Sequence, residues 1–208
     1  MNNHKKTTYP RKNDGVSPVI GVMLMLVVTI IIAAFVSMFA GDIFADTEAS
    51  PSAVLNVKIV SGAGSADDQY VMLLENMGGD SIPSSDIKIM TYYTSTGTER
   101  KVIKGEATAQ TMTKLRVTTD SGDVNIVVPI LANIAAGSIG ETMINFGKYE
   151  FASGTVMTTY NSAGTTKVLG FNVTDTDNYG FKKGSKVTIT VIHTPSQSVL
   201  YNKEVIVE

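Results

Sequence analysis

The sequence contains no cysteine and no tryptophan, and only two of its 208 residues are histidine. Without cysteine the chain can form neither a disulfide nor a thiolate metal site, and it has no cysteine nucleophile. His4 and His193 lie near opposite ends of the sequence, which argues against a histidine-based metal centre. The formal net charge of −2 argues against a nucleic-acid-binding protein, because such proteins are usually basic. We therefore expect no metal, no cofactor and no nucleic acid partner.

Charged residues are scarce, at 17%, and they are missing from one long stretch near the N-terminus. Residues 16–41 contain no ionisable side chain, and residues 19–40 are almost all Val, Ile, Leu, Met, Phe or Ala. About 20 apolar residues in a helix span the hydrocarbon core of a bilayer, which is roughly 30 Å thick. A helix that is apolar on every face is typical of a membrane span or of a buried core. We interpret the stretch as a membrane-inserted helix, the alternative being a buried helix of a globular core.

The two flanks of this stretch carry charges of opposite sign. Four basic residues of the leader precede it, namely Lys5, Lys6, Arg11 and Lys12. Acidic residues follow it, at Asp42, Asp46 and Glu48. Because basic flanks stay in the cytoplasm, we expect the N-terminus inside the cell and the larger C-terminal part outside. Without residues 1–15 the chain has a net charge of −5, so its exterior part is mildly acidic.

The start of the predicted helix is sharply marked. A cleaved secretory signal has only about 7–15 apolar residues, so removal of this longer stretch is disfavoured. The basic leader ends at Gly15, and the apolar stretch begins at Val16. Ser17 is a favoured N-cap residue, and Pro18 suits the first helical turn, where its missing N–H costs nothing. The sequence therefore predicts a retained helix that begins two residues after Gly15.

The segment 12–25, KNDGVSPVIGVMLM, closely resembles the N-terminus of archaeal type IV pilins. Residues 76–89 and 184–196 also resemble this family, over shorter motifs that occur in the expected order. In the family a prepilin peptidase removes the leader, which here implies cleavage between Gly15 and Val16. Bacterial type IV pilins carry Glu at the fifth mature position, where this chain has Ile20. That departure fits the archaeal branch.

The resemblance also implies partners and a location. It implies a homo-oligomeric helical filament, packed through the N-terminal helices and assembled by a pilus ATPase and a membrane platform protein. The precursor is expected in the cytoplasmic membrane and the mature subunit in an adhesive filament on the cell surface. Small residues allow close approach of helices, although they are common in all membrane helices. Those in this stretch are Gly21, Ala33, Ala34, Ser37 and Ala40.

The remainder of the chain reads as a β-rich head. We divide the sequence into a leader over 1–15, an apolar helix over 16–48 and an extracellular β domain over 49–208. Short alternating or β-branched runs separated by turn residues predict an antiparallel sandwich or barrel, and hence an α+β protein. The predicted strands are 54–60, 69–75, 86–93, 99–103, 113–119, 124–130, 155–159, 167–173, 186–193 and 198–207. A turn is predicted at 78–80, where Gly78 and Gly79 supply positive φ.

Few residues of the head fit a known chemical site. Residues 175–180 partly match a calcium-binding loop, but Tyr179 and Lys186 stand where oxygen ligands are required, so we expect a turn. His193 lies in a predicted strand and is expected to be structural. No G-x-S-x-G motif is present, and we expect no enzymatic activity.

Two polar features of the head are expected on its surface. Lys182, Lys183 and Lys186 form a small basic group that is typical of a solvated surface. Asn172 opens the only N-x-S/T sequon of the chain and is a candidate N-glycosylation site. If it is modified, its side chain must be exposed on the surface of the filament.

These observations leave three hypotheses for the function. The leading one is a pilin, a structural subunit of an archaeal surface filament. The first alternative is a membrane-anchored extracellular binding domain that does not polymerise. The second alternative is an archaellin, the subunit of a motility filament, which shares the same helix.

Overall fold

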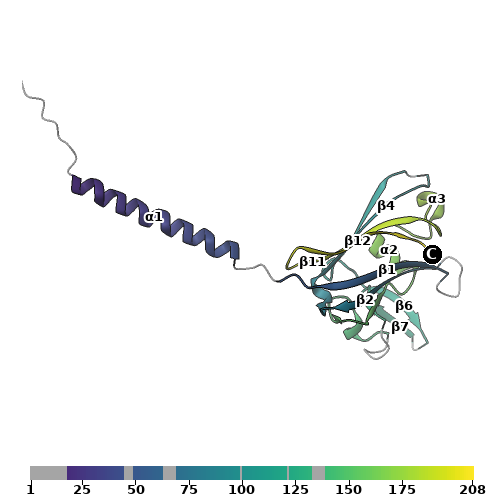
Figure 1. The fold of residues 1–208 in the computed structure, drawn as a ribbon. Helices are drawn as coiled ribbons and strands as arrows, with labels where there is room; N and C mark the ends of the chain where they lie inside the picture. The colour runs from purple at the N-terminus through teal and green to yellow at the C-terminus, as the bar shows by residue number, and fades with distance from the viewer. Residues whose placement is uncertain (1–17, 45–48, 63–68, 99, 121, 133–138) are drawn as a thin grey trace, which may run out of the picture. The chain divides into compact units, whose positions relative to one another are not determined.

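The structure is a computed structural model that describes residues 18–44, 49–62, 69–98, 100–120, 122–132 and 139–208 (Figure 1). The chain divides into two compact units, Met1–Thr47 and Glu48–Glu208, which we describe separately. The first unit contains the single long helix α1 (Pro18–Phe44). At about 1.5 Å per residue, its 27 residues span roughly 40 Å. The helix begins at Pro18, whose fixed φ suits a first helical turn.

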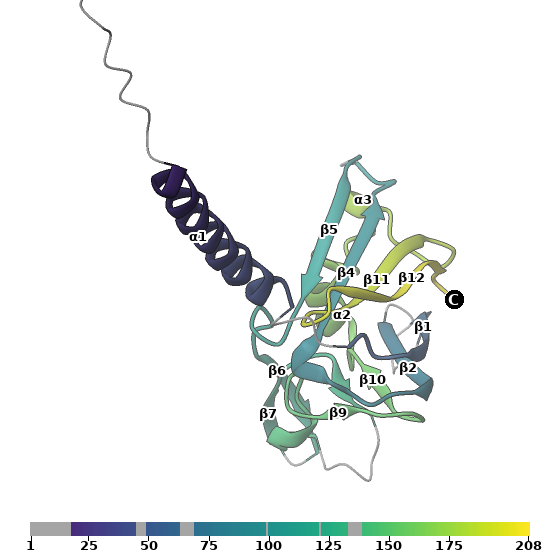
Figure 2. The ribbon, with the colours of Figure 1, turned by 60° about the vertical axis from the view of Figure 1, so that its left-hand side comes forward.

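The second unit is built on two four-stranded antiparallel sheets (Figure 2). In spatial order the first sheet contains β1 (Ala53–Ser61), β2 (Tyr70–Gly79), β10 (Val156–Thr158) and β8 (Ile130–Leu131). The second contains β12 (Ser198–Ile206), β11 (Lys186–His193), β4 (Ile87–Thr94) and β5 (Val102–Ala107). The predicted α+β class, with a long apolar helix followed by antiparallel sheets, is confirmed.

Shorter elements complete the head. Two small antiparallel pairs are β3 (Ile82–Pro83) with β9 (Glu150–Phe151), and β6 (Leu115–Thr119) with β7 (Gly122–Ile126). The helices are α2 (Ser162–Leu169) and α3 (Thr176–Tyr179), with 3-10 turns η1 (Ser84–Asp86) and η3 (Thr142–Ile144).

The core lies between the inner faces of the sheets. On β1, Leu55, Val57 and Ile59 are buried whereas Lys58 is exposed, which is the alternation of a half-buried strand. The same period holds on β4 and β11, so each sheet contributes one apolar face. Burial of these faces is the main stabilising contribution to the head.

The two sheets are joined along one side by their outermost strands. Ile59 on β1 forms a parallel bridge with Val207, just past β12. The backbone N–H of Glu208 donates to the carbonyl of Ile59 at 2.9 Å, and Ser61 N–H donates to the carbonyl of Glu208 at 2.8 Å. Helix α2 contacts β2 of the first sheet and β4 and β5 of the second. A Cβ on Gly105 of β5 would collide with the carbonyl oxygen of Val168, so glycine allows α2 to approach this strand.

The predicted strand over 167–173 is wrong. Residues Ser162–Leu169 form α2, and the chain leaves the helix at Gly170, whose φ is +81°. Asn161 caps the helix, because its side-chain oxygen accepts a hydrogen bond from Gly164 N–H at 2.9 Å. The β-branched residues of this stretch favour a strand locally, but the two caps and burial of Val168 and Leu169 select the helix.

Three further boundaries differ from the prediction. The predicted strand 124–130 is two strands, β7 and β8, which belong to different sheets. The strand expected at 99–103 is β5, which begins later, at Val102. Strand β2 runs through Gly79 with an irregular register opposite Val54 and Leu55, so the expected turn at 78–80 falls within its end. Gly79 has the anticipated positive φ, at +102°, but Gly78 does not, because it continues the extended backbone of β2.

Candidate functional site

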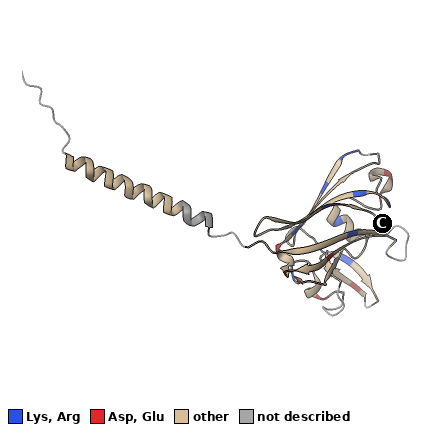
Figure 3. Ribbon diagram, in the orientation of Figure 1, with Lys and Arg blue, Asp and Glu red and all other residues tan. Residues whose placement is uncertain are grey.

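The most unusual surface of the described chain is helix α1. Its large apolar side chains from Val19 to Met38 are between 46% and 70% exposed, on every side of the helix. No Lys, Arg, Asp or Glu interrupts the described residues 18–38 (Figure 3). The hydroxyl of Thr29 donates to the carbonyl of Leu26 at 2.8 Å, so this polar group is satisfied within the helix. Residues Pro18–Met38 are long and apolar enough to cross a membrane.

The small residues of α1 do not all share one face. Ala33 and Ser37 are four residues apart and therefore lie one above the other, in line with Thr29. Ala34 is about 100° around the helix from Ala33. Gly21 lies more than three turns before Ala33 along the helix. Ala40 continues the helix, but its side chain lies outside the described residues. Thr29, Ala33 and Ser37 therefore lie on one face of α1.

The residues predicted to direct processing lie outside the described part of the chain. They are the leader bases Lys5, Lys6, Arg11 and Lys12, the junction Gly15–Val16, and the N-cap residue Ser17. Pro18, the next residue, is the first residue of α1.

The head's candidate metal-binding residues have structural roles. Asp175 caps α3, since its Oδ1 accepts a hydrogen bond from Asn178 N–H at 3.2 Å. His193 is 5% exposed, and its Nδ1 lies 2.7 Å from Ser196 Oγ. Within the described ranges, no three His, Asp or Glu residues are grouped so that they could hold a metal ion.

Asn172 is exposed, in the loop between α2 and α3, whereas its neighbours Phe171 and Val173 are buried. Its side-chain oxygen accepts hydrogen bonds from the backbone N–H of Thr174 at 3.2 Å and from the Thr174 hydroxyl at 2.9 Å. The sequon is therefore accessible, with its two polar side chains in contact.

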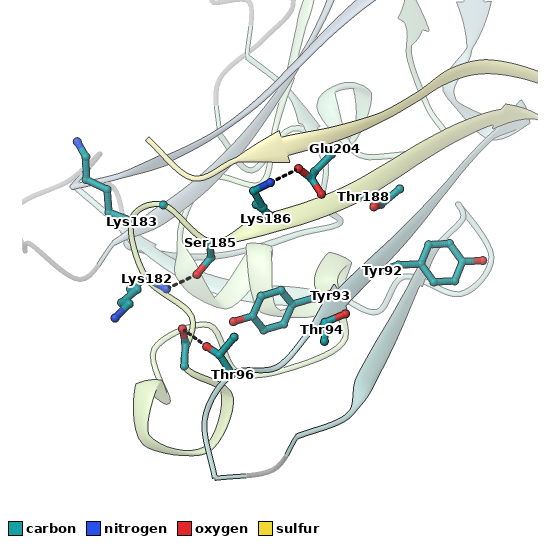
Figure 4. Close-up of a pocket in the computed structure, with 12 residues that line it drawn as sticks. Tyr92, Tyr93, Thr94, Thr96, Lys182, Lys183, Ser185, Lys186, Thr188 and Glu204 are labelled. Carbon is teal, nitrogen blue, oxygen red and sulfur yellow. Dashed lines mark hydrogen bonds and ion pairs between the residues drawn. The ribbon is translucent and has the colours of Figure 1, made fainter.

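One grouping in the head was missed by sequence reasoning. The basic turn at Lys182 and Lys183 lines one end of a groove, and Tyr92 and Thr94 of β4 and Thr188 of β11 line the rest of it (Figure 4). The two segments are about 90 positions apart in sequence, and only the pairing of β4 with β11 brings them together. The local signals were the basic group at Lys182, Lys183 and Lys186, which from the sequence alone is typical of a solvated surface, and an alternating strand that ends in polar residues.

Comparison with known proteins finds a family model that matches the apolar helix. Residues 14–55 match the family model described as archaeal type IV pilin, N-terminal. An uncharacterized protein of Archaeoglobus fulgidus is 39% identical over 82 residues, which cover 38% of this chain and 55% of that protein. The chain thus spans about half the length of this curated relative. No solved structure matches the chain. The matched residues 14–55 include all of helix α1, so the apolar helix lies within the part of the chain that is similar to archaeal type IV pilins.

Proposed function

We propose that this chain is a pilin, a structural subunit of an archaeal type IV pilus-like surface filament with a role in adhesion. The observation that carries the proposal is the apolar surface of α1 within the segment that matches the pilin family. Burying one large apolar side chain contributes about 1.5–3 kcal/mol, so leaving this surface in water is strongly unfavourable. The helix therefore requires an apolar surrounding.

A bilayer and a bundle of sister helices both meet this requirement. Each backbone group of a helix is hydrogen-bonded internally, so the same segment is stable in lipid and in a dry filament core. The face formed by Thr29, Ala33 and Ser37 allows neighbouring helices to pack closely. On this proposal the precursor resides in the cytoplasmic membrane with its N-terminus inside, and the head faces outward. Assembly then moves the helix from lipid into the filament, with the ATPase and platform protein as partners.

Processing is tested by the N-terminus of the assembled protein. Mass spectrometry of purified filaments is expected to show a mature chain that begins at Val16. Gly15→Val should leave the leader attached and prevent assembly, whereas Asn3→Val should be processed normally. A filament subunit that still begins at Met1 would contradict the proposal.

Deletion of the gene distinguishes the pilin proposal from two other possible functions. Loss of surface filaments under the electron microscope, together with loss of adhesion to surfaces, is expected for a pilin. Unchanged filaments would instead identify a membrane-anchored binding domain that does not polymerise. Loss of swimming with adhesion intact would identify an archaellin.

We also propose that Asn172 is N-glycosylated in the mature subunit. Its exposure and the contact of its side chain with Thr174 support this assignment. Mass spectrometry should show the same loss of mass in Asn172→Gln and Thr174→Ala, while Thr174→Ser keeps the modification. Identical masses, apart from the substitutions themselves, would show that the site is unmodified.

A further inference from the structure

The head has a groove of about 510 Å³ on the solvent side of its second sheet. This size falls in the range of small-molecule sites, which is roughly 300–1,000 Å³. Its walls come from β4, β11 and β12 and from the turn 182–185 that precedes β11 (Figure 4). All of these elements belong to the head, so the groove is independent of helix α1.

The turn that carries two of the lysines is held by several hydrogen bonds. Ser185 N–H donates to the carbonyl of Lys182 at 2.9 Å, and Lys182 N–H donates to the Ser185 hydroxyl at 3.0 Å. Gly184, with φ of +88°, donates its N–H to the carbonyl of Val207 at 2.8 Å. The preceding residue, Phe181, is fully buried. The backbone at Lys182 and Lys183 is therefore preorganised, which reduces the entropy lost when a ligand binds.

The groove carries an excess of positive charge at this turn. Lys186 Nζ lies 2.8 Å from Glu204 Oε1, so these two charges compensate each other. Lys182 and Lys183 form no ion pair with any described residue. The two uncompensated side chains leave the turn in different directions (Figure 4), and each ammonium group creates a positive potential that attracts an anion. Hydrogen bonds from ammonium groups to carboxylate or sulfate are stronger than those between neutral groups.

The rest of the groove is lined by hydroxyl groups and an aromatic ring. Thr94 and Thr188 lie on β4 and β11, and their hydroxyls have no hydrogen-bond partner among the described residues. Tyr92 is paired in register with Thr188 and stands away from the lysine turn, toward the other end of the groove (Figure 4). A tyrosine ring offers a flat apolar surface with a polar edge. Such a lining suits a ligand with apolar faces and many hydroxyl groups.

We propose that this groove binds an acidic saccharide chain. Lys182 and Lys183 each bind an acidic group of the chain, a carboxylate or a sulfate, Thr94 and Thr188 form hydrogen bonds with sugar hydroxyls, and Tyr92 packs against a sugar ring. Because the cations and the ring are separated along the groove, the ligand spans several sugars, and an isolated inorganic anion cannot make both contacts. This binding goes beyond the filament proposal and does not depend on polymerisation.

The test uses the full chain in neutral detergent micelles and isothermal titration calorimetry. The probes are an oligogalacturonate, a sulfated oligosaccharide, a neutral dextran oligomer and inorganic sulfate. The expected result is binding of an acidic oligomer at least about tenfold tighter than that of dextran or sulfate. Comparison of the two acidic oligomers identifies whether carboxylate or sulfate is preferred.

Matched variants locate the binding. K182Q/K183Q should weaken binding of the acidic oligomer about tenfold or more, because two charge-assisted contacts are lost. K114Q/K148Q removes two exposed lysines elsewhere in the head and should leave binding unchanged. Tyr92→Leu should weaken binding of the oligomer while leaving the weak affinity for inorganic sulfate as it is. Thermal unfolding of each variant verifies that the head is folded.

Several results would overturn the proposal. Equal affinity in K182Q/K183Q and in the wild type would show that the groove is not the site. If dextran binds as tightly as the acidic oligomers, charge has no role in binding. If inorganic sulfate binds as tightly as the acidic oligomers, the groove is a simple anion site. Absence of binding by both acidic oligomers to a folded wild-type chain would also refute it. If K182Q/K183Q instead abolishes association between head domains, the groove binds a second copy of this chain.

Discussion

The side-chain amide of Asn76 donates a hydrogen bond to the backbone carbonyl of Phe151 at 3.0 Å, and both residues are fully buried. The same amide group donates to the carbonyl of Asp80 at 3.2 Å, and its oxygen accepts from Gly78 N–H at 3.1 Å. One side chain therefore ties the end of β2 to strand β9 and to the turn that follows β2. Each of these backbone groups would otherwise lose a partner, at a cost of about 1–3 kcal/mol for a buried group.

We predict that Asn76→Ala lowers the free energy of unfolding by about 2–3 kcal/mol, because it removes the donor to the buried carbonyl of Phe151 and two further hydrogen bonds. Chemical denaturation followed by circular dichroism measures the change. Asn125 is exposed on β7, and Asn125→Ala should change stability by less than about 0.5 kcal/mol. Equal effects of the two substitutions would contradict the role assigned to Asn76.

Phe181 is the centre of an aromatic cluster. Its ring centroid lies 4.9 Å from that of Tyr70 and 5.3 Å from those of Tyr93 and Phe171. Phe181→Ala is expected to lower the free energy of unfolding by about 3–5 kcal/mol, since it leaves a large cavity. Thermal unfolding measures the loss, with Phe181→Leu expected to have a smaller effect. Met143→Ala, at a position that is 63% exposed, is the control and should be nearly neutral.

Stability at high pH is expected to depend on Tyr149. Burial raises the pKa of its phenol well above the ordinary value of 10.0, and its hydroxyl donates to the carbonyl of Pro129 at 2.9 Å. Because the folded state favours the neutral phenol, its contribution is fully present below about pH 10 and is lost as the pH rises above that value. Urea denaturation between about pH 8 and pH 11 should show this decline.

Tyr149→Phe removes both the hydrogen bond and the ionisable group of this side chain, and measurements at neutral and at high pH separate the two effects. At neutral pH it should cost about 1–2 kcal/mol, because the carbonyl of Pro129 loses its donor. Above about pH 10 the variant should lose stability less steeply than the wild type, since it has no phenol to ionise at this position. Parallel pH profiles for the two proteins would rule out Tyr149 as the titrating group.

Helix α1 should not tolerate a charge at its middle. Ile31→Asp is expected to reduce membrane insertion, since a charged residue at the centre of a membrane helix costs about 2.5–3.5 kcal/mol. Fractionation of cells should show less full chain in the membrane and no filaments on the surface. Ile31→Leu keeps the apolar surface and should behave as the wild type. Filaments of normal length built from Ile31→Asp would refute an anhydrous helix core.

Alternation along the chain was sufficient to predict most of the long strands. Leu55, Val57 and Ile59 repeat with the period of a strand, and this pattern survives in the structure because one face of β1 covers the core. The strand predicted over 167–173 overlaps the end of helix α2, because the β-branched residues there suit an extended backbone. The capping of α2 by Asn161 and its packing over Gly105 depend on neighbours that the local pattern does not contain.

The two candidate sites, the apolar helix and the groove of the head, also differ in whether the sequence alone could predict them. The apolar helix could be read from the sequence alone, because a long stretch without charge is a local property and its consequence in lipid or a filament needs no fold. The groove could not be predicted from the sequence, since Tyr92 and Lys182 lie far apart in sequence and line the same groove only through the pairing of β4 with β11. Composition therefore determined that this protein has a helix whose apolar surface is unstable when exposed to water. Tertiary structure decided which polar side chains of the head converge, because strand pairing joins distant segments whose contacts no local pattern specifies.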